Sequence, residues 1–362
     1  MSRLRSKLEK IGRDPKITAR AVGLRYISDD KPGFHRKKSG SGFTFTDAGG
    51  KTVKDKTQLE RFAKLVIPPA YTDVWISPSE NGHLQFTGKD VAGRKQYRYH
   101  THWNTIRNQS KYHRMELFAR FLPKIREQVQ KDLNRRNLDF EKVLALVIRL
   151  MELTHIRVGN ESYSKLYGSF GLTTLRDRHV KVNGAGMEFE FIGKKGVRQK
   201  VALQSRKLAK LVKQCRDIPG KELFQYYDED GKRQTVDSGD VNAYLREITG
   251  EDFTAKDFRT WSGSVEALHA LHEIGGFDNQ TQCKKNIVQA VDNIAACLGN
   301  TRSVCRKYYV HPAVIDTYER GKLLDYLKPL SGPAADPGTK LTKSEKVFLN
   351  ILKKEEVLKK KG

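Results

Sequence analysis

The chain has 362 residues, 38% of them hydrophobic, and a formal charge of +26, because 68 Lys and Arg outnumber 42 Asp and Glu. This length favours two domains, each with room for a buried core. A charge so far from zero indicates a polyanionic partner, most commonly a nucleic acid. No run of 18 apolar residues occurs, and even residues 143–153 are interrupted by Arg149 and Glu152, so we expect no membrane-spanning helix.

From Val22 to about His100 the predicted N-terminal domain shows short apolar runs between Gly, Pro and Asp, a pattern typical of strands. Residues 1–20 are polar and basic, and we expect them to form a loose arm. Residues 1–108 are therefore predicted to be a small antiparallel β domain with one helix. The expected elements are strands at Val22–Ile27, Gly42–Phe45, Val74–Ser77, His83–Phe86 and Gln96–His100, and a helix at Thr57–Leu65.

The segment 93–99 alternates aromatic and basic residues along one of these strands. Side chains alternate between the two faces of a strand, which places Tyr97 and Tyr99 on one face and Gln96 and Arg98 on the other. An ordinary sheet with two packed tyrosines would have the same pattern. Together with the charge of the chain, the pattern favours a nucleic-acid-binding face.

From residue 109 to about residue 330 the pattern changes to long helices around a small sheet. Met187, Phe189 and Phe191 alternate with glutamates, which predicts a three-stranded meander over residues 178–203 with Lys194 at a hairpin tip. The chain is thus predicted to be of the α+β class. The expected helices are Lys111–Arg135, Phe140–Ile156, Ser205–Cys215, Val241–Ile248, Val265–Ile274 and Thr281–Leu298.

The last segment, residues 331–362, begins with a Gly/Pro-rich linker at 331–338 and ends in Lys359-Lys-Lys361. Thr342 and Glu345 are spaced as in a helix capping box. The segment can be a short final helix or a surface tail, and we expect a partly disordered, basic surface tail.

Cofactor and compartment signals are few. The sequence has no Walker A motif and no Gly-rich dinucleotide turn, so no nucleotide cofactor is implied. The N-terminus lacks the apolar core of a signal peptide. Neither a CxxC spacing nor a disulfide framework is found among the four cysteines, which fit reduced thiols in a cytoplasm: Cys215, Cys283, Cys297 and Cys305.

The segment 298–312 carries a tyrosine pair, Tyr308 and Tyr309, directly after the cations Arg306 and Lys307. Gly299 is placed to end the preceding helix. A phenol is a poor nucleophile at neutral pH because its pKa is near 10, and fixed positive charge around a phosphate would make its attack possible. By residue type alone, a short basic helix with one tyrosine packed in the core is the better explanation of the segment.

Three further motifs accompany this segment, each with one conspicuous cation. They are Glu152-Leu-Thr-His-Ile-Arg157-Val-Gly-Asn160 after a buried helix, Phe191-Ile-Gly-Lys194-Lys195 at the β turn, and Lys256-Asp-Phe-Arg259-Thr-Trp261 at a helix start. In this order, and with these elements, the chain resembles the type IB DNA topoisomerases of the poxvirus-like and bacterial branch, from about Val22 to about Leu327. The resemblance implies a β-rich N-terminal domain followed by a mostly helical catalytic domain of the topoisomerase IB/tyrosine recombinase type.

The resemblance also implies an activity and a set of site residues. The expected activity is relaxation of supercoiled duplex DNA through a DNA 3′-phosphotyrosyl intermediate, without ATP, metal or other cofactor, by a cytoplasmic monomer on the bacterial nucleoid that clamps DNA between its two domains. The family's register from Gly299 selects Tyr309 over Tyr308, although the residues alone do not separate the two. The implied catalytic residues are Tyr309 as nucleophile, Lys194 as general acid, Arg157, Arg259 and Asn300, and the implied DNA contacts are Gln96, Tyr97, Tyr99 and Tyr163.

The sequence departs from the viral pattern in two places. Asn300 stands where the poxvirus enzymes have histidine; either side chain can donate a hydrogen bond to phosphate, but only histidine can carry charge. Cys305 and Arg306 stand where the viral motif has Ser-Lys, and Cys305 is expected to be a small buried residue. Asp257, beside Arg259, is better explained as a helix cap than as a metal ligand.

Two other functions remain open. A tyrosine recombinase would share the catalytic arrangement, although that class usually has His-x-x-Arg where Lys256-x-x-Arg259 stands here. A non-catalytic basic DNA-binding protein is permitted by the composition alone. Relaxation of a plasmid by substoichiometric protein would exclude the second, and failure to relax it as a monomer would favour the first.

Overall fold

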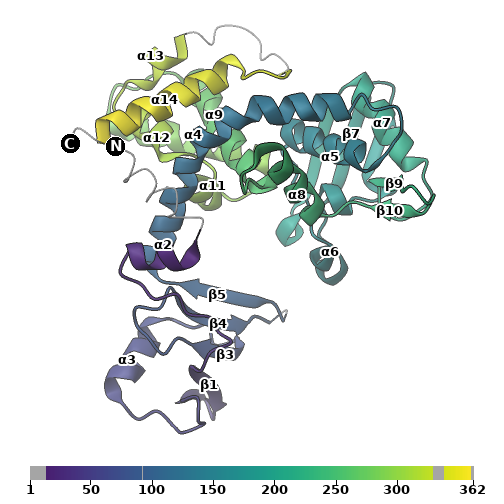
Figure 1. Cartoon of the computed structure of the whole chain (residues 1–362). Coiled ribbons are helices and arrows are strands. Elements are labelled where there is room, and N and C mark those ends of the chain that lie inside the picture. The colour runs from purple at the N-terminus through teal and green to yellow at the C-terminus, as the bar shows by residue number, and fades with distance from the viewer. Residues whose placement is uncertain (1–13, 92, 329–337, 360–362) are drawn as a thin grey trace. The chain divides into compact units, whose positions relative to one another are not determined.

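The computed structural model describes residues 14–91, 93–328 and 338–359, and its described residues form two compact units that divide between Arg114 and Met115 (Figure 1). One helix, α4 (Thr101–Asp132), contains this boundary. None of the described helices is long and apolar enough to cross a membrane.

The N-terminal unit contains the predicted antiparallel sheet and its helix. The five strands lie in the order β2-β1-β3-β4-β5, so that β5 is an edge strand. Phe62 of the helix packs against Val74, Ile76 and Phe86 of the sheet, which forms the core of this unit. The elements are β1 (Phe34–Ser39), β2 (Gly42–Thr46), α3 (Lys56–Lys64), β3 (Thr72–Ile76), β4 (Leu84–Lys89) and β5 (Lys95–Tyr99).

Two predictions for this unit are wrong. Residues 15–21 form helix α2 (Pro15–Ala21) instead of a loose arm, because the Asp14 carboxylate caps its first turn and Pro15 occupies a favourable first position; the remainder of the predicted arm, residues 1–13, lies outside the described residues. The expected strand Val22–Ile27 is reduced to one isolated bridge at Arg25. Strand β1 was not predicted because its side chains are mostly polar and exposed.

The C-terminal unit is mostly helical, as predicted, with the three-stranded antiparallel meander β6-β7-β8 and a short unpredicted hairpin, β9–β10. Its core is centred on α5, eleven of whose residues are buried. The strands are β6 (Val180–Asn183), β7 (Gly186–Ile192), β8 (Arg198–Gln204), β9 (Gln225–Tyr227) and β10 (Arg233–Thr235). The helices are α5 (Phe140–Thr154), α6 (Glu161–Tyr167), α7 (Arg206–Arg216), α8 (Ser238–Thr249), α9 (Ala255–Ile274), α10 (Gln280–Leu298), α11 (Arg302–Tyr308), α12 (Pro312–Glu319), α13 (Leu323–Leu327) and α14 (Lys343–Lys359).

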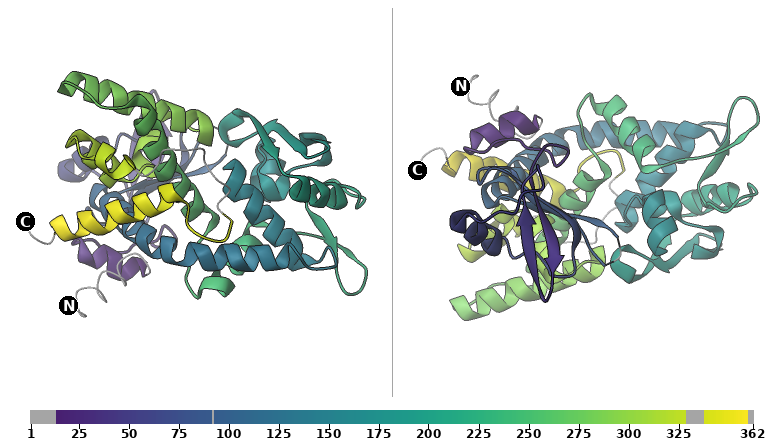
Figure 2. Two further views of the ribbon diagram at one scale, coloured as in Figure 1. Left: turned by 90° about the horizontal axis from the view of Figure 1, so that it is seen from above. Right: turned by 90° about the horizontal axis from the view of Figure 1, so that it is seen from below.

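The expectation of a surface tail is wrong for the residues that begin α14, which packs on α9 and α12 (Figure 1 and Figure 2). The capping box is present, since the Thr342 amide donates to Glu345 and the Glu345 amide donates to the Thr342 hydroxyl. Phe348 is fully buried, with its ring 4.8 Å from that of Trp261. Glu345 is buried as well, and accepts hydrogen bonds from Arg126 (2.7 and 2.9 Å) and from Trp261 Nε1 (2.9 Å). The predicted linker falls almost entirely on residues 329–337, outside the described residues.

Replacing Glu345 with alanine should therefore destabilise the C-terminal unit. The change leaves the buried Arg126 guanidinium without one of its carboxylates, and breaking such a pair costs about 3–5 kcal/mol. Urea denaturation measures the effect, and Glu161→Ala, which breaks an exposed ion pair with Lys165, is the matched control and should cost far less, since an exposed pair is screened by water. A Glu345→Ala loss no larger than that of the control would contradict the interpretation.

The pH dependence of this effect follows from the pKa of Glu345. Burial opposes ionisation of the carboxyl, but the hydrogen bond and charge of Arg126 outweigh burial and lower its pKa from the ordinary value. The stabilisation is therefore complete above the pKa of a glutamate in the unfolded chain, about 4.3, and is lost as the pH falls through the lower folded-state pKa. The difference between wild type and Glu345→Ala should shrink over that acidic range.

Candidate active site

Four of the five predicted catalytic residues lie where helices of the C-terminal unit begin or end. Arg157 follows α5, Arg259 lies in the N-terminal part of α9, Asn300 follows α10, and Tyr309 follows α11. Helix α10 ends at Gly299 in the left-handed conformation (φ 55°), as predicted, which turns the chain and places Asn300 beside Arg157.

Arg259 joins the ends of two helices. One of its terminal nitrogens donates to the carbonyl of His155, the left-handed residue that ends α5, and the other donates to the carbonyl of Leu298 at 2.8 Å. The side chain is 5% exposed, and its guanidinium carbon lies 5.2 Å from the centre of the Tyr309 ring. Arg259 therefore places a buried positive charge directly at the tyrosine.

Arg157 and Asn300 are in direct contact. Arg157 Nη2 donates to Asn300 Oδ1 and, at 3.2 Å, to the carbonyl of Gly299. The oxygen of the Asn300 amide is therefore occupied, while its nitrogen makes a long contact of 3.4 Å with the Leu298 carbonyl and the side chain also interacts with the Cys305 thiol. That nitrogen can donate to another acceptor, such as a phosphate oxygen.

The two arginines form a site of concentrated positive charge. Burial, and then the charge of Arg259, lower the pKa of Arg157 to about 10, so the group is still protonated at neutral pH. Within the described part of the chain, neither guanidinium forms an ion pair with a carboxylate; they donate hydrogen bonds to carbonyl oxygens and to Asn300. Two partly or fully buried cations without an anionic partner are suited to bind an anion from outside the chain.

Tyr309 is held through its backbone by α9. The Ser264 hydroxyl donates to the Tyr309 carbonyl at 3.2 Å, and a Cβ atom added at Gly263 would lie 2.8 Å from the same oxygen. Only glycine at position 263 therefore allows α9 to approach so closely. Tyr308 is different, since it is the last residue of α11 and its ring lies near the ammonium group of Lys307, 5.4 Å away. Because the Arg259 guanidinium lies at Tyr309 and not at Tyr308, the geometry favours Tyr309 as the nucleophile.

Lys194 lies, as predicted, at the tip of the hairpin between β7 and β8. The turn is closed by a hydrogen bond of 2.8 Å from the Gly193 amide to the Val197 carbonyl, and Lys194 itself is exposed. Among the described residues, no hydrogen bond or ion pair joins it to Arg157, Arg259, Asn300 or Tyr309. The structure thus brings four of the five residues together and leaves the fifth on a separate hairpin tip.

The predicted DNA contacts lie on two elements, one in each unit. Tyr97 and Tyr99 share a face of β5, as predicted, with nearly parallel rings 6.1 Å apart, and Tyr97 is 51% exposed. Gln96 donates to Asp90 at 2.9 Å. Tyr163 lies on α6, which has no buried residue, and is also 51% exposed. That these four residues contact DNA stays a prediction.

Several residues that shape the site gave no signal in the sequence. Gly263 and Ser264 hold Tyr309, and the carbonyl of His155 holds Arg259, yet each is separated from its partner by many residues. Burial and the charge of Arg259 lower the pKa of His155 to about 4, so this ring is neutral at pH 7. Asp257 accepts from the Thr254 amide at 2.9 Å and is the expected helix cap.

Cys305, expected to be a small buried residue, is fully buried, and burial raises the pKa of its thiol to about 11.

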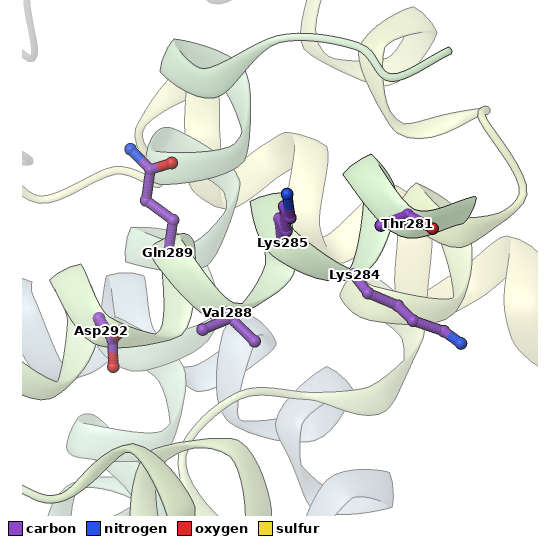
Figure 3. A pocket seen from close by; sticks show the side chains of 6 residues that line it. All are labelled: Thr281, Lys284, Lys285, Val288, Gln289 and Asp292. Carbon is purple, nitrogen blue, oxygen red and sulfur yellow. The ribbon is translucent and has the colours of Figure 1, made fainter. Parts of the chain in front are cut away.

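A separate shallow hollow of about 480 Å³ lies on the outer face of α10 (Figure 3), and none of the predicted catalytic residues lines it. Its lining consists of Thr281, Lys284, Lys285, Val288, Gln289 and Asp292.

Comparison with known proteins identifies the class. The family model of the eukaryotic DNA topoisomerase I catalytic core matches residues 100–327, and that of the bacterial DNA topoisomerase IB N-terminal domain matches residues 42–90. DNA topoisomerase 1B of Acanthamoeba polyphaga mimivirus is 32% identical over 294 residues, which cover 79% of this chain and 88% of the relative. DNA topoisomerase 1B of Vaccinia virus (strain Copenhagen) is 23% identical over 297 residues, which cover 80% and 90%.

The chain belongs to the type IB DNA topoisomerases. DNA is accordingly its substrate, and the predicted fold class and enzyme class are confirmed. Nothing in these matches favours a tyrosine recombinase or a non-catalytic DNA-binding protein.

Proposed function

We propose that this enzyme relaxes supercoiled DNA by transient cleavage of one strand, with Tyr309 as the nucleophile. One observation carries the assignment of the site: Arg259 packs on the Tyr309 ring, Arg157 contacts Asn300 and interacts electrostatically with Tyr309, and neither arginine is paired with a carboxylate among the described residues. A DNA phosphodiester supplies the missing anion. The planar guanidinium groups can each donate two hydrogen bonds to non-bridging phosphate oxygens.

The proposed reaction exchanges one phosphodiester for another. The Tyr309 oxygen attacks the phosphorus and loses its proton, the bond to the 5′-oxygen of the next nucleotide breaks, and that oxygen leaves as a hydroxyl. Because the 3′-phosphotyrosine is itself a phosphodiester, the bond energy is retained and the reverse attack reseals the strand. Rotation of the nicked duplex between the two steps releases torsion, and no ATP is needed.

The remaining residues divide into two proposed roles, stabilisation of charge and donation of a proton. Arg157, Arg259 and the Asn300 amide stabilise charge on the non-bridging oxygens as the transition state forms. Lys194 gives its proton to the departing 5′-oxygen, since a lysine ammonium is protonated at neutral pH and an alkoxide is far more basic. For this step the exposed hairpin tip must come to the scissile phosphate when DNA is bound.

We further propose that one copy of the chain clamps the duplex between its two units. The support is that each unit has its own exposed tyrosine element, β5 with Tyr97 in one and α6 with Tyr163 in the other. Phosphate contacts by the many Lys and Arg residues would release counterions, so binding should weaken steeply with salt.

Relaxation of a supercoiled plasmid in EDTA, without ATP, tests the proposed function. We expect substoichiometric protein to relax both positive and negative supercoils, because transesterification needs no added energy. A non-catalytic DNA-binding protein would leave the plasmid supercoiled at such ratios. A strict requirement for Mg²⁺ would contradict the proposal.

Changing Asn300 separates a catalytic from a structural role. Asn300→Ala should cleave about a hundredfold more slowly, as expected for one lost hydrogen bond to the transition state. Asn300→His should remain active because the ring can still donate a hydrogen bond, whereas Asn300→Asp places a carboxylate beside the phosphate and should be the slowest. Single-turnover cleavage rates distinguish the two roles. An alanine variant as fast as wild type would show that Asn300 has only a structural role at the end of α10.

A further inference from the structure

Gln199 connects the Lys194 hairpin with the loop that carries Asn300. It lies on β8 directly opposite Phe191 of β7, on the face of the hairpin that faces the core of the C-terminal unit. Its side chain extends over two glycines. A Cβ atom added at Gly193 would lie 3.0 Å from Gln199 Cγ, and one added at Gly299 would lie 2.3 Å from Gln199 Oε1 and 2.4 Å from Nε2.

Both glycines belong to segments that carry catalytic residues. Gly193 immediately precedes Lys194, and Gly299 immediately precedes Asn300 while its carbonyl accepts from Arg157. Gln199 therefore occupies the space that side chains at positions 193 and 299 would otherwise fill. The amide makes one weak hydrogen bond, of 3.4 Å, to the carbonyl of Arg198, so its main contacts in the described structure are van der Waals contacts.

The geometry of these contacts matters because, among the described residues, no hydrogen bond or ion pair joins the Lys194 side chain to the other predicted catalytic residues. The base of the hairpin is also tied to the Arg157 segment, through the Phe170 amide, which donates to the Ile192 carbonyl at 2.8 Å, and the Leu172 amide, which donates to the Arg157 carbonyl at 2.8 Å. The turn itself is short and closed by the Gly193–Val197 hydrogen bond, so the position of Lys194 follows that of the hairpin base. A spacer between that base and the Gly299 backbone sets how far the tip stands from the phosphate that Arg157 and Asn300 hold. Misplacement of a catalytic group by about 1 Å can cost about a hundredfold in rate.

We propose that Gln199 is a positioning residue that delivers Lys194 to the leaving 5′-oxygen by filling the space between Gly193 and Gly299. This inference rests on the proposed role of Lys194 as the general acid. In this proposal the volume of the Gln199 side chain sets the distance between Gly193 and Gly299. Its polar amide is not required, which distinguishes Gln199 from residues that would contact DNA through a polar group.

Two variants at Gln199 test the contact, and a third variant elsewhere on the same strand is the matched control. Gln199→Ala empties the space, and Gln199→Leu keeps a side chain of similar bulk without the amide. Gln204→Ala is the control because Gln204 lies on the same strand and its amide also packs on a glycine, Gly186, at the end of the hairpin away from Lys194. Circular dichroism and thermal unfolding establish that each variant is folded.

Single-turnover cleavage is then measured on two duplexes, one with the ordinary 5′-oxygen and one with sulfur at that bridging position. A thiolate leaves without an acid, so a defect in delivering Lys194 disappears on the sulfur duplex, whereas a general loss of structure or of phosphate binding does not. We expect Gln199→Ala to be about 10- to 100-fold slower on the ordinary duplex and close to wild type on the sulfur duplex. Gln199→Leu and Gln204→Ala should be close to wild type on both.

The inference is overturned if Gln199→Ala is as fast as wild type on ordinary DNA, if it is equally slow on both duplexes, or if Gln199→Leu is as slow as Gln199→Ala. Lys194→Ala, measured in parallel, distinguishes the two levels of the proposal. If the sulfur duplex restores the cleavage rate of Lys194→Ala but not that of Gln199→Ala, the proposed role of Gln199 is wrong and that of Lys194 stands. If sulfur restores neither, the general-acid role of Lys194 is wrong, and the inference about Gln199 is wrong with it.

Discussion

Tyr309→Phe should bind duplex DNA with nearly unchanged affinity and form no covalent adduct with it. The substitution removes only the attacking oxygen and keeps the ring that packs beside the Arg259 guanidinium, 5.2 Å from its centre. Loss of a covalent nucleophile typically lowers the rate by roughly 10⁴-fold or more. Detergent trapping of a labelled duplex measures the adduct, and a filter-binding titration measures the affinity.

Tyr308→Phe is the matched control for this prediction, because it makes the same chemical change one residue earlier. Its ring lies near Lys307, and Arg259 is at the neighbouring tyrosine. This variant should retain substantial activity. An inactive Tyr308 variant beside an active Tyr309 variant would show that the register assigned here is off by one residue.

Lys194→Ala should cleave ordinary DNA about 10²- to 10⁴-fold more slowly than wild type, the usual contribution of a general acid. Without a proton the departing 5′-oxygen is a strongly basic alkoxide and a poor leaving group. Sulfur at the same position leaves with a thiol-like pKa and needs no acid. The variant should therefore cleave the sulfur-substituted strand almost as fast as wild type in a single-turnover experiment.

Two comparisons make this result specific to Lys194. Lys195→Ala removes the same charge from the same turn and should be close to wild type on both strands. Arg157→Ala and Arg259→Ala should be slow on both, since those guanidinium groups are proposed to act on non-bridging oxygens. If sulfur leaves Lys194→Ala as impaired as oxygen does, Lys194 only binds phosphate and the proton comes from another group.

Much of the fold could be predicted because its elements have strong periodic patterns. The buried helix α5, the meander with alternating Met187, Phe189 and Phe191, and the Gly299 helix end follow directly from residue spacing. β1 could not be predicted because its side chains are polar and exposed, and its position in the sheet is set by β2 and β3 on either side. α14 was misjudged because the burial of Glu345 depends on Arg126, 219 residues away in the sequence.

The candidate site shows the same division. The catalytic roles of Arg157, Arg259 and Tyr309 were predicted through the resemblance to a known family. Their contacts join segments that are far apart, such as Arg157 and Asn300, separated by 143 positions. Gln199 had no signal of its own, because a glutamine on a strand acquires its neighbours at Gly193 and Gly299 only when the chain has folded.

Trapping the cleaved strand on the protein tests the proposed function of Tyr309 most directly. The substrate is a duplex labelled at either the 5′ or the 3′ end of the cut strand, incubated in EDTA without ATP and stopped with detergent. We expect the 5′-labelled fragment to stay attached to the peptide that contains Tyr309, and the 3′-labelled fragment to be released with a free 5′-hydroxyl. Attachment of the 3′-labelled fragment, or of either fragment at Tyr308, would contradict the proposed 3′-phosphotyrosyl intermediate at Tyr309.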